Sequence, residues 1–135
     1  MKSNDVLPLR RIDHVRFFVG NARQSAYFYR NAFGFDVVAY AGLETRLRHE
    51  AGYVLKQGDI TFVLASPLSG DHPEAQRLIL HGDGVQDIAL EVDDVTAAVL
   101  TLRSFLCVET TNVGSLLSAL QKRRYCQQFV TSIQT

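Results

Sequence analysis

The stretch IDHVRFFVGNARQSAYFYRNAFGF, residues 12–35, returns in altered form as VQDIALEVDDVTAAVLTLRSFL, residues 85–106, at an offset of 73 positions. Each copy begins with a short apolar strand, passes through a polar cap and continues into an amphipathic helix. The apolar helix positions are Ala22, Ala26, Tyr29 and Phe33 in the first copy and Val95, Val99, Leu102 and Leu106 in the second. Four apolar positions in the same register indicate a duplicated module.

The first copy predicts a strand, a helix and then three strands. A strand over residues 12–19 leads to a helix over residues 22–33, which Asn21 caps and Gly34 ends. Further strands are predicted at 35–40, 53–57 and 60–65. Gly58-Asp59 forms the turn between the last two, and the charged connection 43–51 leaves room for a further short strand. Phe17 and Leu90 are expected in the core, facing the helices.

This pattern divides the chain into three parts. Residues 1–10 are a polar, flexible lead-in, and residues 11–113 form one domain. Within it, module one spans 11–66, a polar connection with the option of a short helix around residues 73–80 spans 67–84, and module two begins at 85 and is incomplete. Residues 114–135 form an atypical tail without strand-like alternation.

Composition narrows the classes of function. The chain of 135 residues has 47% hydrophobic residues, enough for one core, and 14 basic residues balance 14 acidic ones. Without net charge or a basic stripe, nucleic acid and anionic membrane are poor partners, and a small molecule is the better expectation. Two cysteines without ligand spacing indicate thiols in a reducing compartment. No apolar run approaches the ~20 residues that span a bilayer, so we expect a cytoplasmic protein.

A strand-helix-three-strand unit, repeated once, is the pattern of the vicinal oxygen chelate fold, an α+β fold of paired βαβββ modules. Four strings make the resemblance closer than the fold: VGNA (19–22), AFGF (32–35), YVLKQGDITFVL (53–64) and HGDGVQDIALEV (81–92). They resemble the N-terminal domain of the 4-hydroxyphenylpyruvate dioxygenase family, and hydroxymandelate synthase shares much of the pattern. The resemblance covers about residues 9–99.

The resemblance implies an enzyme family of tyrosine breakdown. Its members decarboxylate and hydroxylate a small aromatic 2-oxo acid at a non-haem iron(II) held by two histidines and one carboxylate. In the family, those ligands belong to the C-terminal domain, whereas the resemblance here is to the N-terminal one. We therefore expect this chain to be non-catalytic by itself, with no catalytic residue, cofactor-binding residue or metal ligand and no bound iron. Whether the family member is a dioxygenase or a hydroxymandelate synthase stays open.

Three residues are candidates for the remnant of a metal site. His14 occupies the first ligand position of the fold, and the offset of 73 places Asp87 at the second. With no third ligand in sight, His14 and Asp87 are interpreted as facing each other across the sheet in a hydrogen-bonded vestige. Glu91 lies on the same strand face as Asp87 and is expected to pair with Arg16 or to meet solvent. Whether His14 with Asp87 or Glu91 retains metal affinity stays open.

The remaining polar and aromatic signals favour structural roles. His49, His72 and His81 share no ligand spacing and are expected to be solvated in connections. Residues 82–84 (GDG) predict a turn, because a strand follows them and not a helix. The aromatic series is expected to pack in the core; it comprises Phe17, Phe18, Tyr27, Phe28, Tyr29, Phe33 and Phe35.

The tail raises a hypothesis of its own. Residues 107–113 offer one further strand, but residues 114–135 lack the alternation that the remaining strands of module two require. We hypothesise a truncated or frame-shifted product whose tail is not native family sequence. The alternatives are a self-contained binding or resistance protein that dimerises to complete its clefts, and a glyoxalase-like metalloenzyme that uses His14 and Glu91. A fragment also predicts self-association through exposed apolar surface.

Overall fold

The computed structural model describes residues 9–106, and for residues 102–106 the backbone alone. The predictions for residues 1–8 and 107–135, which include the atypical tail, lie outside the described residues. The elements are β1 (Leu9–Phe18), α1 (Ala22–Phe33), β2 (Asp36–Ala41), a 3₁₀ turn (Leu43–Thr45), β3 (Glu50–Gln57), β4 (Ile60–Pro67), α2 (Ala75–His81), β5 (Gly84–Val92) and α3 (Val95–Leu106). No helix in this part of the chain is long and apolar enough to cross a membrane.

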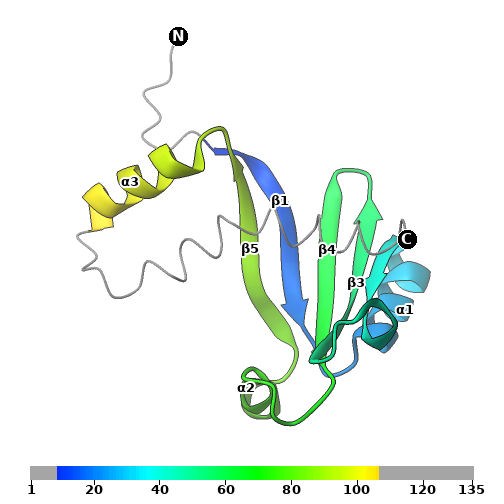
Figure 1. Ribbon diagram of the computed structural model, residues 1–135. Coiled ribbons are helices and arrows are strands. Elements are labelled where there is room, and N and C mark those ends of the chain that lie inside the picture. Colours follow the sequence, from blue (N-terminus) through cyan, green and yellow to red (C-terminus); the bar gives the residue numbers. More distant parts are fainter. Residues whose placement is uncertain (1–8, 107–135) are drawn as a thin grey trace.

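The five strands form one mixed sheet in the order β2-β3-β4-β1-β5 (Figure 1). β1 runs parallel to β4 because α1 crosses over between β1 and the three-strand meander, and all other pairs are antiparallel. The predicted βαβββ module is therefore confirmed. β5 and α3 begin the second module, and α3 covers the residues that lie 73 positions after α1.

The ends of α1 follow from two residues. The Asn21 side chain accepts a hydrogen bond of 3.0 Å from the backbone N–H of Gln24, which satisfies one of the free donors in the first turn. Gly34 has a φ of 76°, a left-handed conformation that costs glycine little, and its N–H donates to the carbonyl of Arg30. The helix therefore has the predicted bounds.

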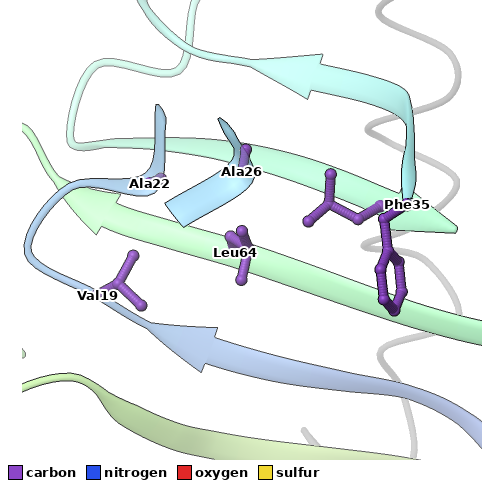
Figure 2. Packing of buried hydrophobic residues seen from close by; sticks show 6 residues of the cluster. Val19, Ala22, Ala26, Phe35 and Leu64 are labelled. Carbon is purple, nitrogen blue, oxygen red and sulfur yellow. The ribbon is translucent and has the colours of Figure 1, made fainter. Parts of the chain in front are cut away.

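The main core lies between α1 and the sheet (Figure 2). Ala22 and Ala26 are small enough to bring the helix against Leu64 of β4, and Val19 and Phe35 close the two ends of this cluster. Leu64 is fully buried. Phe17 packs against the cluster as predicted, but Leu90 is exposed, which contradicts its predicted core position.

The aromatic series divides between core and surface. Phe18 and Phe35 are buried, and Phe17 and Tyr29 are half-buried. Tyr27, Phe28 and Phe33 are exposed, so the prediction that the whole series packs in the core is wrong. Helical periodicity turns Tyr27 and Phe28 away from the strands, whereas Phe33 shares the face of Ala22 and Ala26 but is the last residue of α1.

Two strands begin three residues earlier than predicted, and the other strand bounds differ from the predictions by at most two residues. β1 begins at Leu9, so residues 9 and 10, assigned to the lead-in, belong to a strand. β3 begins at Glu50, within the stretch predicted as a charged connection, which itself contains the 3₁₀ turn. In the second case a buried ion pair accounts for the longer strand.

Candidate functional site

The sheet face that α1 does not cover carries the polar residues of β1. We call it the distal face and define it by His14, Arg16 and Phe18 of β1. These three side chains alternate with those that face α1, because successive strand residues point to opposite sides. All three are buried, although two of them are polar. A buried polar side chain is stable only with hydrogen-bonding partners, so their contacts determine what this face can do.

Arg16 and Glu50 form a buried ion pair across this face. Nη2 of Arg16 donates to both carboxylate oxygens of Glu50, at 3.0 Å and 2.8 Å. The two side chains are 8% and 6% exposed, so water screens their charges little. Sequence reasoning missed Glu50. The signal that could have identified Glu50 is the alternation of side chains along the strand, which places Glu50 on the same, distal side as Gly52 and Val54.

His72 extends this cluster from the connection that follows β4. Its Nε2 lies 3.7 Å from Oε2 of Glu50, and its ring stacks on Phe18 with ring centroids 5.2 Å apart. Its Nδ1 accepts a hydrogen bond from the backbone N–H of Glu74, at 3.1 Å. A neutral ring that accepts at Nδ1 carries its proton on Nε2, which then faces the carboxylate. The prediction of a solvated His72 is therefore wrong.

The other two histidines behave as predicted. His49 and His81 are exposed. His81 is the last residue of α2, so the short helix allowed for in the connection is present, shifted by one or two residues. Gly82-Asp83-Gly84 leads into β5, as the predicted turn requires. Asp83 adds a contact of its own, because its Oδ1 accepts a hydrogen bond of 2.8 Å from the N–H of Gly20.

His14 does not face Asp87 directly. In the antiparallel pair of β1 and β5, His14 lies opposite Ala89 and Asp87 lies opposite Arg16, so the two residues are diagonal neighbours. Nδ1 of His14 is 2.8 Å from Oδ2 of Asp13, the preceding residue. The two residues are therefore not directly opposite each other, because the offset of 73 identifies repeat mates, whereas the strand register decides which residues are opposite. The hydrogen bond expected between them stays a prediction.

Glu91 forms an ion pair, but with a different arginine from the one predicted. Nε of Arg11 donates to Oε2 of Glu91 at 2.6 Å, and the two residues are register partners in the β1–β5 pair. This hydrogen bond raises the pKa of Arg11 above its ordinary value. Arg16, the predicted partner, instead makes the bidentate contact with Glu50.

A three-ligand iron site is not assembled in this part of the molecule. Within residues 9–106, no group of three histidine, cysteine or acidic side chains lies close enough together to hold a metal ion. His14 and Asp87 are diagonal neighbours in the strand register, and Arg11 binds Glu91. The two-histidine, one-carboxylate set that non-haem iron(II) requires does not fit these residues.

A second polar contact lies on the surface beyond β2. The Tyr40 hydroxyl donates to Oε2 of Glu44 at 2.8 Å, and the hydrogen bond to this carboxylate is the main cause that raises the pKa of Tyr40 to about 12. Gly42 lies between the two, where a Cβ atom would come within 2.2 Å of the Tyr40 oxygen. Glycine therefore permits this contact, which stabilises the turn after β2.

Comparison with known proteins agrees with this architecture. Residues 11–123 match the family model described as Glyoxalase/Bleomycin resistance protein/Dioxygenase superfamily. The chain belongs to this superfamily. The matched region extends past residue 113, the predicted end of the domain. The α+β fold of paired modules, expected from the repeat, is the fold of this family.

Several 4-hydroxyphenylpyruvate dioxygenases are similar to this chain. The protein from Caenorhabditis briggsae is 48% identical over 96 residues, which cover 70% of this chain and 24% of the relative. The protein from Dictyostelium discoideum is 50% identical over 84 residues, which cover 62% and 23%. The chain thus spans about a quarter of the length of these relatives, and the matched quarter is their N-terminal part.

Among solved structures, a mutant of 4-hydroxymandelate synthase from Streptomyces coelicolor matches with a TM-score of 0.63 and 31% identity, covering 67% of this chain and 28% of that protein. A methylmalonyl-CoA epimerase matches with a TM-score of 0.58 at 24% identity, covering 71% and 70%. The second likeness shows the fold alone.

Proposed function

We propose that this chain is the N-terminal, non-catalytic part of a 4-hydroxyphenylpyruvate dioxygenase-type protein. In this proposal, the reaction on the aromatic 2-oxo acid and the iron(II) that supports it belong to the part of the relatives that the chain does not match. The observation that carries the proposal is the identity of 48% over 96 residues, confined to 24% of the relative. The proposed full-length protein would then act in tyrosine breakdown. We expect it in the cytoplasm.

The chemistry of the distal face supports a structural role. Glu50, buried on that face, is bound by Arg16, and Glu91 is bound by Arg11. Carboxylates held by guanidinium groups are poor candidates for cation ligands, because binding a metal would leave the arginine charge unpaired. In particular, the ion pair of Glu91 disfavours the glyoxalase-like reading in which His14 and Glu91 hold a metal.

Oxygen uptake tests the proposal. The purified chain, supplied with iron(II) and 4-hydroxyphenylpyruvate, should consume no oxygen above the rate of iron(II) and substrate alone, whereas the full-length Caenorhabditis briggsae relative serves as the positive control. Equilibrium dialysis of iron(II) measures retention separately. Substrate-dependent uptake that disappears in His14→Ala would overturn the proposal, and tight iron binding lost in the same variant would favour the metalloenzyme alternative.

A further inference from the structure

A hollow lies on the α1 side of the sheet, at the end where the helix begins. It has a volume of about 480 Å³ and is bordered by the start of α1, the 3₁₀ turn and strands β2, β3 and β4. These elements belong to the first module and lie at the opposite side of the sheet from β5, where the second module begins (Figure 1). We call it the tyrosine hollow and define it by Arg23, Tyr40, Glu44, Ala51, Tyr53 and Ser66.

Two small residues form the floor of the tyrosine hollow. Ala51 of β3 and Ser66 of β4 are register partners. Ser66 lies two residues after Leu64, which packs against Ala22 at the start of α1, so Ser66 shares the face of Leu64 but lies one row beyond the helix. Alanine and serine are too small to fill the space above the strands. The hollow therefore stays open at this end of α1.

Ser66 directs a polar group into this floor. The residue is only 7% exposed, and its side chain makes no hydrogen bond with any other residue of the range 9–106. A buried hydroxyl without a partner costs free energy, so such groups are usually satisfied by a protein group, a water molecule or a ligand. Because Ser66 lines the hollow, a polar molecule that enters the hollow can supply this partner.

Opposite charges border the tyrosine hollow on two different elements. Arg23 lies in the first turn of α1, and it forms no ion pair with an acidic side chain of the described part of the chain. The free N–H groups and the dipole of this first turn add to its attraction for an anion. Glu44 lies in the 3₁₀ turn, and a backbone hydrogen bond and the bond from Tyr40 lower its pKa. Glu44 is therefore a carboxylate at neutral pH and attracts a cation.

Two tyrosine rings form an apolar wall between these charges and the sheet. Tyr40 and Tyr53 are register partners in the pair of β2 and β3, and their ring centroids are 4.9 Å apart. Both residues are half-buried, so part of each ring remains accessible from the hollow. Aromatic rings pack favourably against other rings and apolar groups. The wall therefore suits a ligand that has an apolar body in addition to its charges.

We propose that the tyrosine hollow binds a free α-amino acid with an apolar or aromatic side chain. The carboxylate of the amino acid lies at Arg23 and the start of α1, its ammonium group at Glu44 and its side chain against the ring of Tyr53. A simple anion fits less well because Glu44 repels it, and a simple cation fits less well because Arg23 repels it. The inference does not rest on the proposed function, because it uses no residue of the distal face.

Titration of the whole chain with L-phenylalanine, followed by two-dimensional amide NMR, tests the proposal. We expect saturable shifts at the N–H groups of Arg23, Glu44 and Ser66, with a dissociation constant on the order of 1 mM for so small a ligand. Two analogues each lack one charge: 3-phenylpropionate lacks the ammonium group, and 2-phenylethylamine lacks the carboxylate. Each should bind about threefold to fivefold more weakly, as partly exposed charge pairs allow. Equal affinity for all three compounds, or no saturable shift at these groups, would overturn the proposal.

Charge variants assign each contact. Arg23→Gln should remove the advantage of L-phenylalanine over 2-phenylethylamine, and Glu44→Gln should remove its advantage over 3-phenylpropionate. Arg30→Gln, in the last turn of the same helix, is the matched control and should change neither ratio. These ratios compare ligands on one variant, so a general loss of stability does not alter them. Ratios that stay unchanged in both Arg23→Gln and Glu44→Gln would overturn the proposal, even if L-phenylalanine binds elsewhere on the chain. Oxygen uptake is measured separately, so failure here leaves the proposed function untouched.

Discussion

Val15 lies directly opposite Ile88, its own equivalent in the second module, at the contact between β1 and β5. On either side of this pair, His14 meets Ala89 and Arg16 meets Asp87. The two modules are thus related by a local two-fold axis at Val15 and Ile88, and no residue other than those on the axis faces its repeat mate. The duplication explains the fold, whereas the axis explains why repeat mates such as His14 and Asp87 are diagonal neighbours and not directly opposite each other.

The core between α1 and the sheet should carry more of the stability than β5 does. Leu64→Ala removes a fully buried side chain and should lower the free energy of unfolding by about 2–5 kcal/mol. Leu90→Ala, the identical change at a side chain that is 38% exposed, should cost markedly less. Urea unfolding of both variants measures the difference, and equal midpoint shifts would show that β5 is covered in solution.

Local signals predicted the first module well. The bounds of α1 follow from Asn21 and Gly34, whose roles depend on neighbours within a few residues. The start of β3 could not be predicted in this way, because Glu50 is a charged residue that becomes buried only through Arg16, 34 positions away. Alternation alone predicts a core position for Leu90. Alternation shows which residues of a strand share one face, but it does not show whether another element covers that face.

The candidate site was only partly accessible from the sequence. His14 was singled out correctly as a distal-face residue, since the alternation along β1 is regular. His72 was missed because its position depends on the ring of Phe18 and on a backbone N–H two residues ahead, neither of which leaves a periodic pattern. The register of β1 and β5 includes bulges, and no local rule predicts these shifts.

His72 should anchor the connection between β4 and α2. His72→Ala removes the stacking on Phe18 and the contact with Glu50, so we expect lower stability and faster proteolysis between residues 67 and 75. His49→Ala, at an exposed histidine near β3, is the matched control and should have little effect. In addition, ring nitrogen NMR should identify the Nε2–H tautomer when the ring is neutral, and an Nδ1–H tautomer would contradict the hydrogen bond to Glu74.

Tyr40 should ionise at a higher pH than an ordinary tyrosine does. Its pKa of about 12 lies above the ordinary value of 10.0, mainly because its hydroxyl donates to Glu44. The contribution of this contact to stability is therefore fully present below the unfolded pKa, near 10, and is lost as pH rises toward 12. Absorbance titration of the phenolates should show a late step that Tyr40→Phe removes and Glu44→Gln moves to lower pH. A late step that persists in Tyr40→Phe would assign it to another tyrosine.

Replacing Arg16 and Glu50 together should lower the free energy of unfolding less than replacing either residue alone. Glu50→Gln removes the buried carboxylate that accepts both hydrogen bonds from Nη2 of Arg16, which should cost about 3–5 kcal/mol in the free energy of unfolding. The double variant Arg16→Met with Glu50→Leu removes both charges and keeps apolar volume, so it should recover much of that loss. Urea unfolding of Arg16→Met, of Glu50→Leu and of the double variant gives the coupling energy. The exposed guanidinium of Arg11, paired with Glu91, provides the control, and its replacement by Met should change stability far less. If the double variant is as unstable as the sum of the single ones, the two side chains act independently and the distal face is not organised around their contact.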